Sequence, residues 1–192
     1  NDKIMSREIE KLKEELLKLL KKEALRVGEI ILSSGATSSF YLDGRCVTLN
    51  AKGAYLSARL ILDLLKDAKI EAVGGPTLGA DPIAGALAAV SYLQKRPLKT
   101  FIIRKTPKAH GARRQIEGPS LKKGSWLVLV DDVATSGKSF LESIDILRSE
   151  GFKVDTDVCI VDRQEGAKEA LAQKDCRLFS LFTLQDFGIK NK

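Results

Sequence analysis

Apolar residues follow two patterns along this chain: short runs of consecutive branched residues, and segments in which apolar residues recur every three or four positions. The first pattern is typical of strands buried on both faces, and the second of amphipathic helices. The runs predict strands at 70–76, 99–104, 126–130, 156–162 and 177–183. The periodic segments predict helices at 6–26, 53–67, 80–93, 137–150 and 164–173.

Strands and helices therefore alternate along most of the chain. This order predicts an α/β fold in which helices flank a mostly parallel central sheet. The N-terminal part differs, because a helix that Ser6 would cap precedes the segment FYLDGRCVTLN (40–50). The Asp43-Gly44 pair in that segment predicts a β-hairpin turn. The chain has no repeat or flexible linker, so we expect a single domain over residues 1–192.

Composition narrows the classes of partner. No stretch approaches the roughly 20 apolar residues of a membrane span, and the charged opening residues do not resemble a secretory signal. We therefore expect no membrane partner and a cytoplasmic location. The cysteines Cys46, Cys159 and Cys176 are widely spaced, which favours buried free thiols over a disulfide framework or a zinc site.

The charge balance is compatible with two kinds of partner. A formal charge of +7 suits nucleic acid, but it suits small anionic substrates equally well. Aromatic content is only 6%, which argues against a stacking platform for single-stranded nucleic acid. We therefore expect small anionic substrates and no nucleic-acid partner.

The segment VLVDDVATSGKS (128–139) holds the clearest candidate chemistry. Asp131 and Asp132 follow a buried strand, and ligands of parallel sheets collect beyond the carboxyl ends of the strands. Small hydroxyl residues and Gly137 then lead into a helix, whose first turn carries unpaired N–H groups that attract phosphate. A carboxylate pair therefore lies beside a predicted phosphate cradle.

Two adjacent carboxylates at the edge of an apolar core repel each other unless neutral or positive groups lie between them. Sugar hydroxyls and hydrated Mg²⁺ both meet that need, so we expect a phosphorylated sugar as the ligand. A Walker loop is excluded, because Asp132 stands where that motif requires its first glycine. The other interpretation, in which the acids only cap the helix, accounts for one aspartate but not for two.

The same segment resembles the signature of type I phosphoribosyltransferases, which bind 5-phosphoribosyl 1-diphosphate (PRPP). Other segments are similar, in the same order, to orotate phosphoribosyltransferases: SSGATSSFYLD, GGPTLGADPIAGALA, RKTPKAHGARRQIEG and VDRQEG. The resemblance implies the type I phosphoribosyltransferase fold. In that fold, residues of about 1–50 and the C-terminal end would form a hood, and 104–118 would be a mobile catalytic loop.

The resemblance also implies a set of site residues. Those that would bind PRPP are Arg104, Lys105, Lys108, His110, Asp131, Asp132, Val133, Ala134, Thr135, Ser136, Gly137, Lys138 and Ser139. Of these, the catalytic residues would be Lys108, His110, Asp131 and Asp132. Arg104 and Lys108 would act on the neighbouring subunit's site. The aspartates would hold the ribose hydroxyls and, through water and PRPP, the Mg²⁺ cofactor. Orotate would contact Tyr41, Leu42, Thr135 and Arg163.

The implied reaction moves the phosphoribosyl group of PRPP to orotate, giving orotidine 5'-phosphate and pyrophosphate in the synthesis of UMP. The implied enzyme is a homodimer with shared active sites. Two alternatives stay open: a phosphoribosyltransferase for a purine base, and a non-catalytic regulator that binds PRPP. Arg163 favours orotate, because guanidinium pairs with a carboxylate in a bidentate way. The other interpretation of Arg163 is a surface ion pair with Glu165 or Asp162.

Two further features of the sequence are a basic loop after residue 103 and two positions at which the chain differs from some family members. The loop favours an enzyme over a regulator, although a solvated charged surface is the alternative interpretation. Some family members carry a lysine where this chain has Ser33, and Tyr-Lys where it has Leu78-Gly79. Two cationic contacts to PRPP are therefore absent from this chain. We expect its binding of PRPP to depend more strongly on the loop cations and on Mg²⁺.

Overall fold

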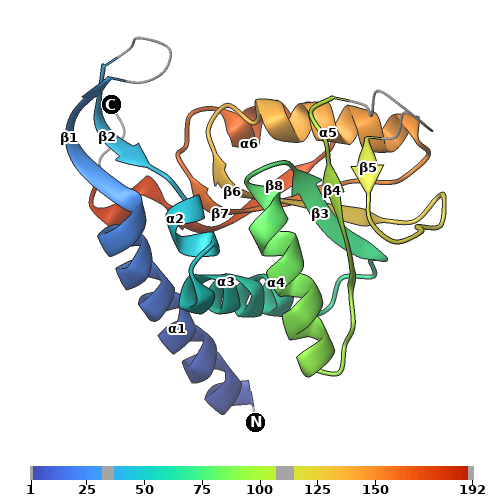
Figure 1. Ribbon diagram of the computed structural model, residues 1–192, viewed down its shortest axis with the longest axis horizontal. Helices are drawn as coiled ribbons and strands as arrows, with labels where there is room; N and C mark the ends of the chain where they lie inside the picture. The colour runs from blue at the N-terminus through green and yellow to red at the C-terminus, as the bar shows by residue number, and fades with distance from the viewer. Residues whose placement is uncertain (1, 32–36, 107–114, 190–192) are drawn as a thin grey trace.

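The computed structural model describes residues 2–31, 37–106 and 115–189 (Figure 1). Lys108 and His110 lie outside these residues. The helical elements are α1 (Asp2–Leu19), η1 (Leu20–Ala24), α2 (Arg45–Thr48), α3 (Ala51–Leu64), α4 (Ala80–Leu93), α5 (Lys138–Ser149), α6 (Ala167–Ala172) and η2 (Leu184–Phe187). The strands are β1 (Leu25–Ile31), β2 (Thr37–Leu42), β3 (Ala72–Pro76), β4 (Lys99–Ile103), β5 (Ile116–Glu117), β6 (Leu127–Ala134), β7 (Thr156–Asp162) and β8 (Arg177–Thr183).

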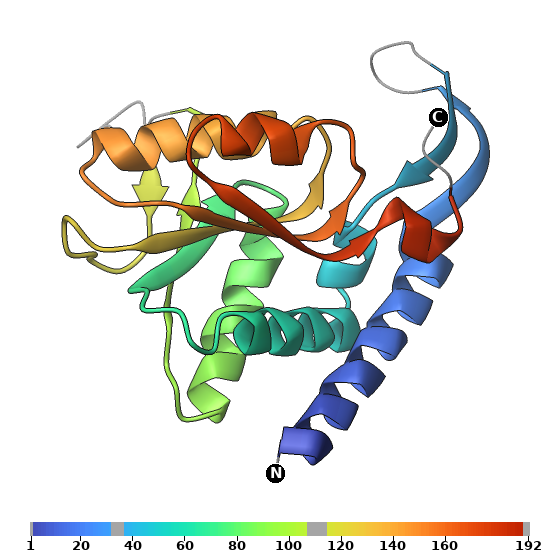
Figure 2. The ribbon, with the colours of Figure 1, turned by 180° about the vertical axis from the view of Figure 1, so that it is seen from behind.

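The central sheet has the strand order β5-β4-β3-β6-β7-β8. Every neighbouring pair is parallel except β4 and β5, which are antiparallel. Helices α3 and α4 cover one face of the sheet, and α5 and α6 cover the other (Figures 1 and 2). This arrangement confirms the predicted α/β fold with a mostly parallel sheet.

Strand β6 shows why the strands are apolar throughout. Leu127 and Leu129 pack in the cluster that includes α5 and α6, whereas Val128 and Val130 pack in the cluster that includes α3 and α4. Successive side chains of a strand point to opposite faces, so a strand covered on both faces needs apolar residues at every position.

The N-terminal helix is longer at its start and shorter at its end than the sequence predicts. It begins at Asp2, so Ser6 lies inside the helix and does not cap it. It ends in the π-helical turn η1, after which Leu25 is extended at φ −92° and ψ 129°. Residues 25–31 form a strand because they pair antiparallel with β2, a partner that periodicity does not reveal.

The predicted hairpin over 40–50 is wrong. Asp43 and Gly44 lead from β2 into the short helix α2 and do not connect two strands. The Asp43 carboxylate accepts hydrogen bonds from the backbone N–H and the guanidinium of Arg45, which favours a helical turn here. The two-stranded sheet is instead β1 with β2.

Helix α1 and the C-terminal end pack together beside the sheet. Leu16 and Leu20 are fully buried in the same cluster as Phe187 of η2. Ion pairs join Glu15 to Lys52 and Glu8 to Arg59, so α1 is also tied to α3. The β1–β2 hairpin extends beyond the sheet from this base (Figures 1 and 2).

The cysteines are free, as the sequence predicts, and Cys159 and Cys176 are buried. Cys46 is exposed on α2, which corrects the expectation of a third buried thiol. None of the described helices is both long and apolar enough to cross a bilayer.

Candidate active site

A cavity of about 320 Å³ lies at the carboxyl ends of β3, β6 and β7, beside the end of β2. The sequence-predicted residues that line it are Tyr41, Leu42, Lys105, Asp131, Asp132, Val133, Thr135, Ser139 and Arg163. Side chains from the hairpin, the sheet edge and the start of α5 therefore meet in one place. This is where the topology of a parallel sheet directs a ligand.

Asp131 and Asp132 lie within β6, which continues four residues beyond the predicted strand. The backbone N–H of Asp132 donates to Asp131 Oδ1 at 2.9 Å, and that of Val133 donates to Asp132 Oδ1 at 2.9 Å. Burial and the adjacent Asp132 carboxylate raise the pKa of Asp131 well above its ordinary value. Burial also raises the pKa of Asp132. A cation or ligand hydroxyls beside the two carboxyls would oppose these shifts by favouring the ionised pair.

Helix α4 approaches this carboxylate pair closely. A Cβ atom at Gly79, the residue before α4, would overlap Asp131 Oδ1 and lie 2.6 Å from Asp132 Oδ1. Thr77 Oγ1 donates to both carboxylate oxygens of Asp81, at 2.9 and 2.6 Å, which fixes the β3–α4 turn. The backbone of this turn therefore forms one wall of the cavity.

The predicted phosphate cradle is the turn between β6 and α5. Gly137 has a φ of 78°, a left-handed conformation that favours glycine, and it is the N-cap residue of α5. A Cβ there would also lie 3.1 Å from Ala167 Cα, because the turn packs on the start of α6. Thr135 and Ser139 line the cavity, whereas Ala134 is buried and the Lys138 side chain is 82% exposed.

Arg163 follows β7, and its backbone N–H donates to Ala134 O at 2.9 Å, which places it beside the cradle. Its guanidinium forms an ion pair with Glu165 at 2.7 Å and lies over the Phe40 ring, 4.8 Å from the centroid. Of the two acidic neighbours considered from the sequence, Glu165 is the one that pairs with it. The ion pair does not remove Arg163 from the cavity, which it lines.

The two described cations of the basic loop, Arg104 and Lys105, line adjacent hollows. Lys105 lines both the main cavity and a second hollow of about 560 Å³. Arg104 lines only the second, where its guanidinium lies 3.7 Å from a Glu117 carboxylate oxygen. The predicted residues Lys108 and His110 lie outside the described residues.

Six lining residues were not among the predicted sites: Asp43, Arg45, Pro76, Thr77, Leu78 and Gly79. Arg45 pairs with Asp43 through two hydrogen bonds of 2.9 and 3.0 Å, and this partner lowers the pKa of Asp43. For Thr77, Leu78 and Gly79, the missed signal is their position directly after the strand predicted at 70–76, the same criterion that identified Asp131.

The residues at the cavity suit a metal ion that binds together with a phosphate ligand. They suit less well a metal ion held by protein side chains alone. No group of three or more His, Cys, Asp or Glu side chains suited to a metal occurs in the part of the chain that the structure describes. Asp131 and Asp132 nevertheless offer oxygen atoms at the cavity, and Mg²⁺ typically takes one or two carboxylates together with water and substrate phosphates.

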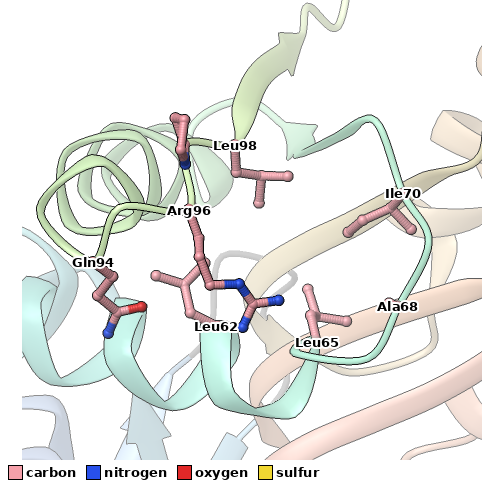
Figure 3. Close-up of a pocket in the computed structure, with 8 residues that line it drawn as sticks. Leu62, Leu65, Ala68, Ile70, Gln94, Arg96 and Leu98 are labelled. Carbon is pink, nitrogen blue, oxygen red and sulfur yellow. The ribbon is translucent and has the colours of Figure 1, made fainter.

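A further pocket of about 340 Å³ lies near the opposite, amino-terminal ends of β3 and β4 (Figure 3). Its lining is mainly apolar and includes Leu62, Leu65 and Ile70. The Arg96 guanidinium there donates to the backbone oxygen of Lys66. None of the residues that line this pocket carries a carboxylate.

Comparisons with known proteins identify the family to which the chain is similar. A family model described as "Phosphoribosyl transferase domain" matches residues 48–187. The chain is 44% identical over 171 residues to an orotate phosphoribosyltransferase of Synechocystis sp., covering 89% of this chain and 86% of the relative.

Two solved structures of Mycobacterium tuberculosis orotate phosphoribosyltransferase are similar to this fold. The complex with Fe(III) dicitrate has a TM-score of 0.83 and 35% identity, covering 93% of this chain and 99% of the other. The complex with PRPP has a TM-score of 0.78 and 32% identity, with the same coverage.

Proposed function

The chain belongs to the orotate phosphoribosyltransferase family, and we propose that it transfers the phosphoribosyl group of PRPP to orotate at the cavity formed by β3, β6 and β7. The products are orotidine 5'-phosphate and pyrophosphate, in pyrimidine synthesis. The observation that carries the proposal is the carboxylate pair Asp131–Asp132, which lines one cavity together with Thr135 and Ser139 of the phosphate cradle and with Arg163.

Each end of PRPP has a matching region in the cavity. The Asp131 and Asp132 carboxylates accept hydrogen bonds from the ribose hydroxyls. The turn 134–139 takes the 5-phosphate with backbone N–H groups at the start of α5 and with the hydroxyls of Thr135 and Ser139. The diphosphate extends toward the β3–α4 turn and Lys105, where a positive side chain lies at the cavity wall.

Orotate binds beside the ribose, between the hairpin residues Tyr41 and Leu42 and the residues Thr135 and Arg163. Its carboxylate pairs with Arg163, which a neutral purine base would not require. In the reaction, N1 of orotate loses its proton and forms a bond to C1 of the ribose, while the bond from C1 to the pyrophosphate oxygen breaks and pyrophosphate leaves with the electron pair. The protein contributes by aligning the two reactants, by excluding water and by offsetting the charge that develops on pyrophosphate.

The charge that develops on pyrophosphate is offset by loop cations and Mg²⁺. Lys105 lies at the cavity, and we propose from the sequence that Lys108 and His110 also contact the diphosphate. Asp131 and Asp132 would hold Mg²⁺ indirectly, through water and PRPP. When bound, the cation supplies Lewis-acid stabilisation of the diphosphate.

We also propose that the protein acts as a single-domain cytoplasmic homodimer, with 1–50 and the C-terminal end forming a hood and 104–118 acting as the catalytic loop. A groove of about 690 Å³ adjoins the active-site cavity, and Asp43, Arg45 and Leu78 line both. Leu49 and Leu78 are 74% and 63% exposed in this groove. We propose that a second copy covers these apolar side chains and that its Arg104 and Lys108 act at this site.

Acceptor turnover tests the proposal. The purified protein is given PRPP and Mg²⁺ with orotate, uracil, adenine, guanine or hypoxanthine separately, and pyrophosphate release is measured. We expect turnover of orotate alone, abolished by a chelator and strongly reduced by Lys108→Ala. Turnover of a purine would overturn the acceptor assignment, and PRPP binding without any turnover would identify a PRPP-binding regulator.

A further inference from the structure

Arg163 is held on one edge and one face by two residues that have no part in the proposed reaction. Its Nε donates to Glu165 Oε1 at 2.9 Å, and its Nη2 lies 2.7 Å from the same oxygen. The Phe40 ring of strand β2 covers one face of the guanidinium, with 4.8 Å between the guanidinium carbon and the ring centroid. The Arg163 side chain is consequently only 14% exposed.

The turn that carries Glu165 is itself fixed by hydrogen bonds. The backbone N–H of Gln164 donates to Asp162 Oδ1 at 2.7 Å, and the N–H of Arg163 donates to Ala134 O at 2.9 Å. Gly166 then takes a φ of 101° as the N-cap residue of α6. Glu165 therefore reaches Arg163 from a defined backbone position.

A guanidinium offers two edges for bidentate pairing: one formed by Nε and one terminal nitrogen, the other by the two terminal nitrogens. Glu165 occupies the first edge. At the second edge, Nη1 makes no hydrogen bond or ion pair with any residue that the structure describes. Because Arg163 lines the cavity, this second edge is the one available to a bound ligand.

From this geometry we infer that Glu165 is a positioning residue, which orients Arg163 so that its two terminal nitrogens receive the acceptor's carboxylate end-on. The inference rests on the proposed function, in which Arg163 contacts orotate. Phe40 fixes the plane of the guanidinium, and Glu165 fixes its rotation within that plane. The site thereby selects a flat acceptor that carries a carboxylate at its rim.

A positioning role and a competing role predict opposite results. If Glu165 positions Arg163, its removal frees the guanidinium to rotate and weakens acceptor binding. If Glu165 instead competes with the acceptor for Arg163, its removal strengthens acceptor binding. One hydrogen bond and one ion-pair contact to a single Glu165 oxygen leave the other edge free, which is why the structure supports positioning.

Steady-state kinetics of Glu165→Ala and Glu165→Gln test the inference, with orotate and PRPP varied separately. We expect Glu165→Ala to raise the KM for orotate about tenfold, as loss of a hydrogen bond to a charged group does. The kcat and the KM for PRPP should stay near their wild-type values. Glu165→Gln keeps an acceptor oxygen and should recover part of the loss. Glu169→Ala, an exposed change on α6, is the matched control and should change neither KM.

An orotate KM that stays unchanged, or that falls, in folded Glu165→Ala would overturn the inference. The coupling between the two residues gives a second test. In an Arg163→Ala background, Glu165→Ala should cause no further loss, and additive losses would contradict a role exerted through Arg163. If Arg163→Ala itself leaves the orotate KM unchanged, the proposed orotate contact fails. If it raises that KM while Glu165→Ala does not, the positioning role alone fails.

Discussion

Gly79 lies directly against Asp131, so that a side chain at position 79 would occupy the space of the Asp131 carboxylate. The absence of a Cβ thus lets the β3–α4 turn and the β6 carboxylates share one cavity. The steric reason for glycine at this position is therefore its distance from the β6 carboxylates in this protein.

We predict that Gly79→Ala displaces the carboxylates and lowers kcat/KM for PRPP by on the order of a hundredfold, the cost of misplacing a binding group by about 1 Å. The matched control is Gly85→Ala in α4, where a Cβ would meet no atom within 4 Å. That change should leave activity intact and raise the free energy of unfolding by up to about 1 kcal/mol, because alanine favours a helix interior. Equal activity losses in the two variants would contradict the steric account.

The raised pKa values of Asp131 and Asp132 predict a pH dependence of substrate binding. Burial favours the protonated carboxyls of the free site, whereas Mg²⁺ and PRPP bind the ionised pair. Binding should therefore release protons, and the KM for PRPP should rise as the pH falls, beginning at a pH above the ordinary titration range of aspartate. Kinetics at constant Mg²⁺ over a pH series measure this effect. The slope should be smaller in Asp132→Asn, and equal slopes would contradict the assignment.

Asp157 predicts a pH dependence of stability that is independent of the active site. Its side chain is fully buried in β7, and neither carboxylate oxygen has a hydrogen-bond partner in the described part of the chain. Burial raises its pKa to about 7, although the nearby Arg148 partly opposes this shift. The folded state therefore holds the proton more tightly than the unfolded state, in which aspartate titrates near about 3.9.

The stability from protonated Asp157 is fully present below the unfolded pKa and is lost as the pH rises through the folded pKa. We expect the free energy of unfolding to fall between about pH 4 and pH 7, by on the order of a few kcal/mol. Asp157→Asn removes the ionisable group, so its free energy of unfolding should decline less over this range. Its largest gain in stability relative to the wild type should appear above pH 7. Urea unfolding of both proteins over this range measures the difference, and parallel profiles would contradict it.

The groove beside Leu49 predicts how the protein self-associates. Leu49→Glu places a charge on the proposed contact surface and should weaken dimer formation by about tenfold or more. Leu93→Glu, at an equally exposed leucine on α4, is the control. Analytical ultracentrifugation over a concentration series compares them. A dimer unaffected by Leu49→Glu but lost in Leu93→Glu would place the interface elsewhere.

Much of the central sheet follows from the sequence. Strands β7 and β8 and helix α4 have the predicted bounds, because their apolar patterns are uninterrupted and end in strong turn signals. The sequence prediction placed the hairpin at 40–50 because Asp43-Gly44 gives a strong turn signal. The strands that do pair, β1 and β2, show only a weak alternation of apolar and polar residues. Local hydrogen bonds to Asp43 make that turn a helix start.

The candidate site shows the same division. Asp131 and Arg163 could be predicted because they follow apolar strands that end at the same edge of the sheet. Arg45 could not, because its place depends on its contact with Asp43, which no local pattern reveals. Gly79 carried the same signal as Asp131, its position after a strand, but its contact with the β6 carboxylates is visible only in the structure. The Glu165–Arg163 pair was considered from the sequence only as an alternative to a site role, whereas in the structure Arg163 both pairs with Glu165 and lines the cavity.

The central claim is that phosphoribosyl transfer depends on the Asp131–Asp132 pair. The most direct test is formation of orotidine 5'-phosphate from PRPP, Mg²⁺ and orotate by the wild type and by the Asp131→Asn/Asp132→Asn variant. The two carboxyls are buried and repel each other, so replacing both with amides should not unfold the protein. Circular dichroism of the double variant checks that it is folded. We predict a loss of about a thousandfold, the upper range for removal of preorganised electrostatic groups. A folded double variant that forms the product at the wild-type rate would contradict the account.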